Sequence, residues 1–294
     1  MSNVNVIDSA ESLSNLKGNA FLGFPPELAS STISFEGKGN IFVCEKGVKL
    51  KNSHIKFKGN NALVVLNASK HPLRIDVTAW SNSVFYLGRD SFFSPVGVLY
   101  AIASDERSII IGDDTLFSFN IWMRTSDPHL VYSVDTMKRI NASKDVLVGD
   151  HVWVGQEVLL LKGTTIGSGS IIGGASVCAG KVIPSNCSWA GNPAKQISKN
   201  VFFSKKSVYR FSEGDEERFS TFHKKKYIYR SSKTNHDVFL NSIYRCETPE
   251  EKLKLLQDFF SVNDKNKLAL AEIQKEKRKS IFNRFKKFRK NQTH

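Results

Sequence analysis

The sequence predicts an all-β core built as a parallel β-helix of hexapeptide repeats, followed by a basic C-terminal extension that is mainly α-helical. The first observation is a six-residue repeat between Val148 and Val177, in which an aliphatic residue leads every hexad and Gly follows it in four of the five. A period of six is neither the 3.6 of an amphipathic helix nor the 2 of a half-buried strand. It fits short strands that turn a corner after every sixth residue, with the aliphatic side chain stacked inward and Gly where the backbone bends.

The second observation is that the same hexad recurs upstream in a weaker form. Leu87-Gly88 and Ile111-Gly112 each begin one, and the two leading residues lie 24 positions apart, which is four hexads. Farther towards the N-terminus, turn-forming residues separate short apolar or alternating runs, at residues 41–43, 54–57, 63–66 and 73–77. We interpret these runs as degenerate first coils. An antiparallel sandwich over residues 31–86 is the alternative, because the hexad phase is hard to follow there.

The third observation is a change of charge and periodicity after residue 199. Residues 200–294 hold 23 Lys and Arg against 12 Asp and Glu, so they carry +11 of the chain's net charge of +14. Thr248-Pro249-Glu250-Glu251 has the pattern of a capping box with Pro at the first helical position, which predicts a helix from there. A second helix is expected from about Asp264, and residues 279–290 would place aromatic side chains opposite a face of cations. Such a segment either binds a membrane surface or packs on the β-helix with its charged face in solvent.

These observations divide the chain into three parts: a leader segment over residues 1–30, the β-helix over residues 31–200 and the basic extension over residues 201–294. The four cysteines show neither paired nor metal-like spacing, and the N-terminus has no apolar stretch that resembles a signal peptide or a membrane span. We therefore expect a cytoplasmic protein. The extension would attract a polyanion or bring the protein to the inner membrane as a peripheral contact.

The candidate functional site lies where the repeat is interrupted. Between the hexads at Ile111 and Val148 the sequence is irregular over roughly five hexads. A solenoid pairs its backbone groups from coil to coil, so such a segment must leave the wall as a loop or an aberrant coil. This insertion contains His129, and its position there makes it the candidate functional residue among the seven histidines. His151 lies inside a regular hexad, and we expect it to be an ordinary outward-facing residue of the coil.

An ordered set of motifs runs from the insertion to the last coil: Ser126-Asp127-Pro128-His129, Ile140-Asn141, residues 148–155, residues 163–167 and Ala190-Gly191-Asn192-Pro193-Ala194-Lys195. His129 precedes Trp153 by 24 residues. In these motifs residues 111–200 resemble the left-handed β-helix acetyltransferases of the hexapeptide-repeat superfamily. That superfamily includes the galactoside and maltose acetyltransferases and the capsular polysaccharide and polysialic acid O-acetyltransferases.

The resemblance implies a left-handed coil, a homotrimer and an acetyl-CoA-dependent O-acetyltransferase. A sugar hydroxyl is a poor nucleophile near neutral pH and needs a base within hydrogen-bond reach. His129 matches the family's base, and its imidazole can afterwards protonate the leaving thiolate. Trp153 matches the family's active-site Trp, whose indole can form a flat wall and donate one hydrogen bond. The chain has no nucleophile elbow of the Gly-x-Ser-x-Gly type, which favours direct transfer over an acyl-enzyme.

The family pattern also implies a site for CoA along the late coils. The residues that would line it are Gln156, Gly174, Ala179, Lys181, Lys195 and Lys199, and the three lysines are the candidate phosphate contacts. No metal is expected, because a zinc site needs three convergent ligands and only His129 and His151 lie in the strong repeat.

Three functions remain open. The first is an O-acetyltransferase that acts on an anionic bacterial-type surface (capsular) polysaccharide or its precursor, with no nucleic-acid partner. The second is an N- or O-acetyltransferase of a small sugar or nucleotide sugar. The third is a non-enzymatic hexapeptide scaffold with a membrane-binding tail. The charge of the extension favours the first, because it would attract a polyanion.

Overall fold

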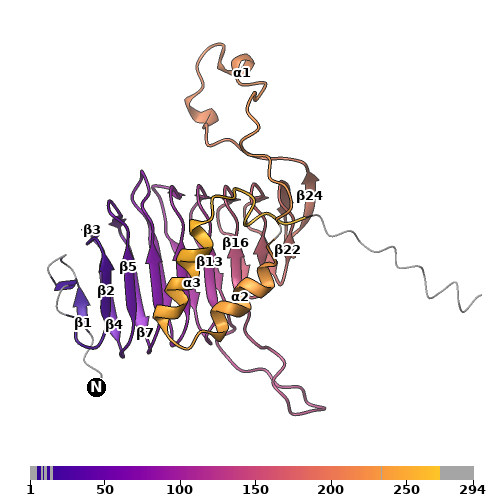
Figure 1. The fold of residues 1–294 in the computed structure, drawn as a ribbon. Helices are drawn as coiled ribbons and strands as arrows, with labels where there is room; N and C mark the ends of the chain where they lie inside the picture. Colours follow the sequence, from indigo (N-terminus) through magenta and orange to yellow (C-terminus); the bar gives the residue numbers. More distant parts are fainter. Residues whose placement is uncertain (1–4, 8, 10–11, 14–15, 233, 272–294) are drawn as a thin grey trace, which may run out of the picture.

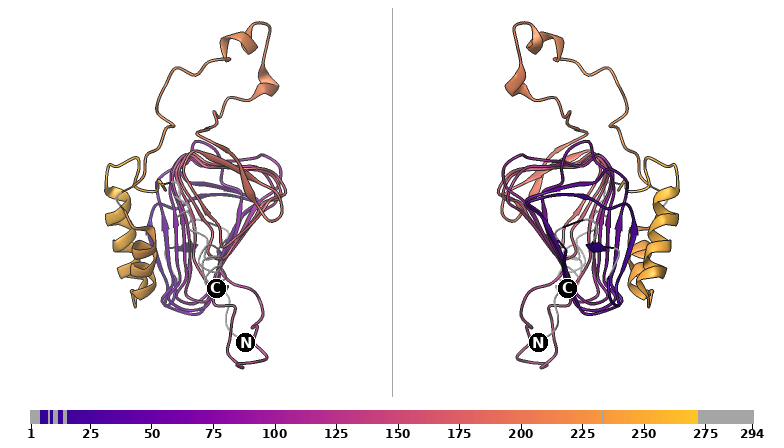
Figure 2. Two further views of the ribbon diagram at one scale, coloured as in Figure 1. Left: turned by 90° about the vertical axis from the view of Figure 1, so that its right-hand side faces the viewer. Right: turned by 90° about the vertical axis from the view of Figure 1, so that its left-hand side faces the viewer.

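The protein is described here by a computed structural model, which covers residues 5–7, 9, 12–13, 16–232 and 234–271. Its strands stack into a prism with three faces, two of them long sheets that run from one end to the other (Figures 1 and 2). Successive strands of the chain pass to successive faces, so neighbours within a sheet come from successive coils. The predicted parallel β-helix is confirmed.

Sheet A contains β1 (Asn5–Ile7), β4 (Thr32–Glu36), β7 (His54–Lys58), β9 (Ile75–Ala79), β12 (Leu99–Ala103), β15 (Ile121–Arg124), β18 (Leu159–Leu161) and β21 (Val177–Ala179). Sheet B contains β2 (Ala20–Gly23), β5 (Ile41–Cys44), β8 (Leu63–Leu66), β10 (Val84–Leu87), β13 (Ser108–Ile111), β16 (Val146–Val148), β19 (Thr165–Ile166) and β22 (Val182–Ile183). The third face has a short pair, β3 (Glu27–Ala29) and β6 (Lys49–Lys51), and sheet D, with β11 (Phe92–Phe93), β14 (Leu116–Phe117), β17 (Trp153–Val154), β20 (Ile171–Ile172), β23 (Cys187–Ala190) and β24 (Lys195–Lys199).

The solenoid begins before residue 31, where the sequence placed its start. β2 pairs in parallel with β5, and β3 pairs in parallel with β6, so both are part of the first coil. β1 adds to the N-terminal edge as an antiparallel partner of β4. Residues 31–86 form parallel coils, which rules out the antiparallel sandwich. The described strands of residues 1–30 therefore belong to the solenoid instead of forming a separate leader.

The hexad pattern explains the core of the later coils. The five leading aliphatic side chains are all fully buried: Val148, Val154, Leu160, Ile166 and Ile172. The Gly that follows is required by close coil-to-coil packing, since a Cβ on Gly149 would lie 2.5 Å from the backbone nitrogen of Ser168. The repeat thus stacks apolar side chains inside the prism while the backbone turns the corner.

The C-terminal extension returns along the outside of sheet B (Figure 2). After β24 the chain forms a projecting segment with the 3-10 helix η2 (Val208–Arg210) and α1 (Asp215–Arg218), and then α2 (His236–Arg245) and α3 (Pro249–Ser261). α3 begins at the predicted capping box, where Thr248 and Glu251 each accept a hydrogen bond from the other's backbone. Ile243 of α2 and Leu256 of α3 are buried against the outer face of sheet B. The described part of the extension is thus packed on the coil.

The second expected helix is not found in the described residues after Asp264, because residues 265–268 form a turn. The basic segment 279–290 lies outside the described residues. Within residues that the structure does describe, no helix has the length and apolar character needed to cross a bilayer.

Candidate active site

The insertion that carries His129 leaves the prism at the edge between sheets A and B. β15 ends at Arg124 and β16 begins at Val146, and the intervening residues project away from the coil as a long loop (Figure 1). The two ends of the loop meet at the edge, where the Lys144 backbone donates to the Thr125 carbonyl at 3.0 Å. The expectation of a loop that leaves the wall is confirmed.

The backbone of this loop is fixed at His129 by one side chain, Asn141. Its Nδ2 donates to the His129 carbonyl at 2.8 Å and to Oδ2 of Asp127 at 2.9 Å, while its Oδ1 accepts from the Val131 backbone at 3.0 Å. The His129 side chain itself is exposed. Asn141 therefore holds the segment around His129 in one conformation and leaves the imidazole accessible. Asn141 was part of the resemblance, but it was not among the predicted site residues.

A cationic edge continues from the loop along the next two coils. Lys162 donates to the Asn141 carbonyl at 3.1 Å and also pairs with Asp127. Hydrogen bonding from Lys162, then from Asn141, holds the pKa of Asp127 below its ordinary value. The backbone of Gly180 donates to the Lys162 carbonyl at 3.1 Å, which places Ala179 and Lys181 on the same edge, one coil farther on. The structure thus groups two predicted cofactor residues with the His129 loop, and it adds Lys162, which no repeat or motif singled out.

The other predicted residues lie elsewhere. Trp153 stands on β17 in sheet D with 37% of its surface exposed, and its indole nitrogen lies 3.5 Å from Oγ of Ser118. Gln156 and Gly174 follow at the edge between sheets D and A, where the Ala175 backbone donates to the Gln156 carbonyl at 2.8 Å. Lys195 and Lys199 begin and end β24, the edge strand of sheet D.

The predicted residues therefore form two groups on one chain. The edge between sheets A and B bears His129, Ala179 and Lys181, whereas sheet D and its edges bear the other predicted residues: Trp153, Gln156, Gly174, Lys195 and Lys199. In a three-sided prism, sheet D is the face opposite the edge between sheets A and B, as the end-on views of Figure 2 show. A single chain does not bring His129 and Trp153 together.

The environment of His151 differs from the prediction. It was expected to face outward as an ordinary coil residue, but its side chain is fully buried. The rings of Phe203 and Tyr227, both from the C-terminal extension, lie parallel to the imidazole on either side of it. The expectation was wrong because an outward-facing side chain of the coil reaches solvent only where the coil is uncovered. Here the C-terminal extension covers the coil.

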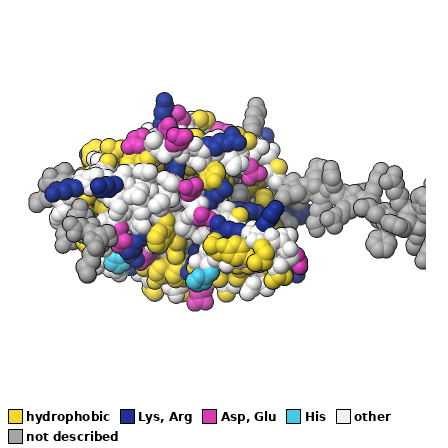
Figure 3. Space-filling model, turned by 90° about the horizontal axis from the view of Figure 1, so that it is seen from below, with side chains coloured by type: hydrophobic (Ala, Val, Ile, Leu, Met, Phe, Trp, Pro, Cys, Tyr) yellow, Lys and Arg dark blue, Asp and Glu magenta, His cyan; other side chains and the backbone are white. Residues whose placement is uncertain are grey.

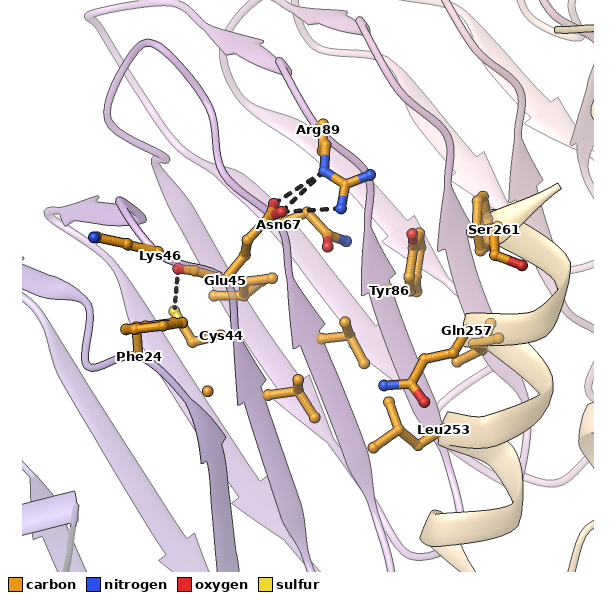
Figure 4. Close-up of a pocket in the computed structure, with 16 residues that line it drawn as sticks. Phe24, Cys44, Glu45, Lys46, Asn67, Tyr86, Arg89, Leu253, Gln257 and Ser261 are labelled. Atoms are coloured by element: carbon orange, nitrogen blue, oxygen red, sulfur yellow. Dashed lines mark hydrogen bonds and ion pairs between the residues drawn. The ribbon is translucent and has the colours of Figure 1, made fainter. Parts of the chain in front are cut away.

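Two of the cavities of the protein lie on outer faces of the coil. One, of about 520 Å³, lies on the outer face of sheet B beside α3 and contains the ion pair of Glu45 and Arg89 (Figure 4). The other, of about 470 Å³, lies between the outer face of sheet A and the base of the His129 loop. In the part of the chain covered by the structure, no cluster of three or more His, Cys, Asp or Glu is placed to hold a metal ion.

A prism of hexad coils, with a His on a fixed loop at one edge and a partly exposed Trp on the opposite face, defines a hexapeptide-repeat acyltransferase. No protein-family model matches the chain. The polysialic acid O-acetyltransferase of Escherichia coli O1:K1 / APEC is 31% identical to it over 217 residues, which cover 67% of this chain and 69% of that protein. The enzyme of the same name from Neisseria meningitidis is 30% identical over 188 residues, which cover 64% of this chain and 86% of that protein.

The solved structure of the polySia specific acetyltransferase NeuO superposes with a TM-score of 0.57 and 30% identity, covering 69% of this chain and 92% of that one. The chain belongs to the family of the polysialic acid O-acetyltransferases, within the hexapeptide-repeat acetyltransferases. Its fold is accordingly the left-handed β-helix of that family, and the protein is an acetyltransferase.

Proposed function

We propose that this enzyme transfers the acetyl group of acetyl-CoA to a hydroxyl of an anionic capsular polysaccharide of the polysialic acid type. The relatives named for polysialic acid support this acceptor. The charge of the chain is in keeping with it, because a net charge of +14 attracts a polymer that carries a carboxylate on every sugar.

The observation that carries the proposal is the loop that presents His129. Asn141 fixes the backbone on both sides of His129, and the imidazole remains exposed on a cationic edge. A general base must be held within hydrogen-bond reach of the proton that it removes, and a fixed backbone meets this requirement. The polyanionic acceptor would approach the same edge because of Lys162 and Lys181.

The proposed reaction is a direct transfer in which His129 handles the proton. Acetyl-CoA supplies the acetyl group as a thioester when it is bound. His129 accepts the proton of the acceptor hydroxyl as the hydroxyl oxygen bonds to the carbonyl carbon. The carbon–sulfur bond then breaks, and the imidazolium returns the proton to the departing thiolate. Trp153 would provide a flat apolar wall, because its indole is partly exposed and its N–H has only a long contact with Ser118.

The residues at the edge between sheets A and B suit the phosphates of CoA. The backbone is open at Gly180, where an added Cβ would meet no atom within 4 Å. Lys162 and Lys181 flank this open backbone in neighbouring positions. Lys195 and Lys199, on β24, would bind phosphates at the group of residues on sheet D and its edges. Both groups thus offer cations. In a site shared by two protomers, the pantetheine arm would run along Ala179 of one chain and Gln156 and Gly174 of its neighbour.

We also propose that the enzyme is a homotrimer whose sites lie between protomers. His129 and Trp153 stand on opposite sides of one prism, so a site that uses both needs the loop of one protomer against sheet D of its neighbour. A closed ring of identical interfaces would give three equivalent sites. The four cysteines show no paired spacing in the sequence, which favours a cytoplasmic location; the basic extension would allow peripheral contact with the inner membrane.

Thiol release from acetyl-CoA tests the proposal directly. The purified enzyme would be assayed against polysialic acid, a neutral capsular polymer, and small acceptors such as galactosides and nucleotide-linked amino sugars. We expect turnover with the acidic polymer and product that loses its acetyl group under mild alkali, as an ester does. Turnover with a small amino sugar alone would favour N-acetylation of a precursor. If none of the acceptors led to thiol release, a non-enzymatic scaffold would be favoured.

A further inference from the structure

We propose that the cavity at the base of the His129 loop binds a carboxylate-bearing sugar of the acceptor polymer next to the sugar that is acetylated. Arg124 would bind the carboxylate, and Trp80 would stack on the sugar ring. This inference rests on the proposed function, and it adds an acceptor-binding site to it.

The cavity joins the coil to the catalytic loop. Its volume is about 470 Å³, within the range of sites for small ligands. Ile102 and Arg124 of sheet A line one side, and Asp127, Leu130 and Arg139 of the loop line the other. Asp127 and Leu130 lie on either side of His129 in the sequence, so a ligand in the cavity would contact the segment that holds the base. Figure 3, which views this lower side of the molecule, shows cationic and hydrophobic side chains next to each other.

Among the described residues, one cation of the cavity has no hydrogen-bond or ion-pair partner. Asp105 pairs with Arg139 at 2.9 Å and accepts from Ser143 at 2.7 Å, and Asp127 pairs with Lys162. Both carboxylates are therefore engaged with cations of the protein. The side chain of Arg124, by contrast, makes no hydrogen bond or ion pair with any described residue. Its guanidinium lies over the ring of Trp122, at 5.0 Å from the centroid, and this contact leaves its N–H groups unused.

A free guanidinium of this kind is suited to a carboxylate. The planar fork of Arg can donate two parallel hydrogen bonds to the two oxygens of one carboxylate, and such bonds are stronger than those between neutral groups. Partial burial in a cavity reduces screening by salt and strengthens the contact further. Phosphates would also accept these bonds, but an acidic polysaccharide offers a carboxylate on every sugar beside the reacting one.

Trp80 supplies the apolar surface that a sugar ring requires. It follows β9 directly, lines the same cavity and is 45% exposed, although it is one of the largest apolar side chains of the protein. A sugar ring has an apolar face of C–H groups that packs on an aromatic ring, while its polar edge remains available for hydrogen bonds. Trp80 and Arg124 together therefore match both features of an acidic sugar. Neither residue touches the reacting atoms in this proposal, so their effect should appear in acceptor binding.

The test compares acceptors with and without the carboxylate. Short sialic acid oligomers, and the same oligomers with their carboxyl groups reduced to alcohols, would be used as acceptors for the parent enzyme and for Arg124→Gln, Arg124→Lys and Trp80→Ala. Arg124→Gln should raise the acceptor KM by about tenfold or more, the usual effect of losing a charged hydrogen bond, with kcat and the KM for acetyl-CoA unchanged. On the reduced oligomers, Arg124→Gln and the parent should have the same KM.

Two further variants and one control complete the design. Arg124→Lys keeps the charge without the fork, so its KM should lie between those of the parent and Arg124→Gln. Trp80→Ala should raise the KM for both kinds of oligomer, because it removes stacking. Arg245→Gln, an exposed position at the end of α2, should behave as the parent does.

The results separate this inference from the function on which it rests. If the parent transfers acetyl to the acidic oligomers and Arg124→Gln keeps the parental KM, the cavity does not bind the acceptor carboxylate. An equal rise in KM on the reduced oligomers would likewise overturn the assignment to Arg124. If the parent acetylates no carboxylate-bearing glycan at all, the proposed function fails, and the acceptor-binding site fails with it.

Discussion

Asp114 of the coil binds the imidazole of His151, with its Oδ2 at 2.7 Å from Nδ1, and the extension closes over this pair. Nε2 of His151 lies 3.0 Å from the carbonyl oxygen of Phe203, and Lys205 contacts the other oxygen of Asp114 at 2.7 Å. Both ring nitrogens therefore face oxygen atoms that can accept a hydrogen bond. Burial opposes ionisation of Asp114, but hydrogen bonds from His151 and Lys205 prevail and hold its pKa below the ordinary value.

We expect His151→Ala to loosen the attachment of the extension. The variant loses two hydrogen bonds and leaves a gap between the rings of Phe203 and Tyr227, which should cost about 2 to 4 kcal/mol. Thermal unfolding would measure the loss of stability, and limited proteolysis between residues 204 and 231 would show whether the extension opens. His71→Ala, at an exposed position, serves as the control. An unchanged melting temperature with unchanged protease resistance would contradict the assigned role.

Asp150 should make the protein less stable as the pH rises. Burial raises the pKa of its carboxyl group to about 7, above the value near 4 of an unfolded chain. A group with a raised pKa in the folded state contributes stability below pH 4, and this contribution is lost as the pH rises towards 7. Asp150→Asn should flatten this decline and stabilise the protein at pH 8 by about 1 to 3 kcal/mol. Denaturant unfolding at pH 5 and pH 8 measures both effects, with the exposed Asp258→Asn as the control. Parallel pH profiles for parent and Asp150→Asn would refute the prediction.

His129→Ala should abolish most of the activity without disturbing the fold. General base catalysis contributes about 10² to 10⁴ in rate, so kcat should fall by this factor while the melting temperature stays at the parental value. His223→Ala, an exposed position on the projecting segment, should retain parental turnover. Near-parental kcat in the purified His129→Ala protein would reject this residue as the base.

Mixed trimers should reveal whether the site spans two protomers. His129→Ala and Trp153→Ala chains, each inactive alone, would be mixed under conditions that exchange subunits. If the loop of one chain meets sheet D of the next, a mixed trimer contains at least one site with both native residues, and part of the activity returns. Trimers in which every chain carries both substitutions provide the background activity. Verified mixed trimers with no recovered activity would place each site within one chain.

Removal of α2 and α3 should leave the coil insoluble. These helices bury the outer side chains of sheet B, and Leu256 in α3 is fully buried there. A chain ending at residue 200 exposes this face and should aggregate, whereas a chain ending at residue 271 should stay soluble. Leu256→Ala should destabilise the protein by about 2 to 5 kcal/mol. The soluble fraction after expression measures the first effect and chemical denaturation the second. A soluble and folded chain of residues 1–200 would show that the helices are dispensable.

The coil was predictable from the sequence because each hexad satisfies a local rule. Val148, Val154 and Ile172 lead repeats whose Gly residues are needed for close packing of adjacent coils, and these requirements are visible in the sequence. His129 could also be singled out from the sequence as a candidate functional residue, because it lies where the regular repeat is interrupted. The residues that packing between adjacent coils requires thus appear in the sequence at a fixed spacing.

Contacts between distant parts of the chain left no such record. The environment of His151 depends on Phe203 and Tyr227, and no periodicity links these three positions. One signal was present but not used. The strand at residues 63–66 reads Leu-Val-Val-Leu, without alternation, which indicates a strand covered on both faces. Arg124 has no side-chain ion pair among the described residues because the neighbouring carboxylates pair with other cations in three dimensions, which sequence alone cannot show.

The helices that return across sheet B bear on how the protein is synthesised. The coils interact mainly with adjacent coils and can form in order as the chain leaves the ribosome. The outer surface of β8, β10 and β13, however, receives its cover from α2 and α3, which follow these strands by roughly 120 residues or more. The nascent protein must therefore carry an uncovered apolar sheet until almost the whole chain has been translated. Chaperones bind nascent chains, and the yield of this protein in cells should depend on them. This dependence should be stronger than for a solenoid without such an extension.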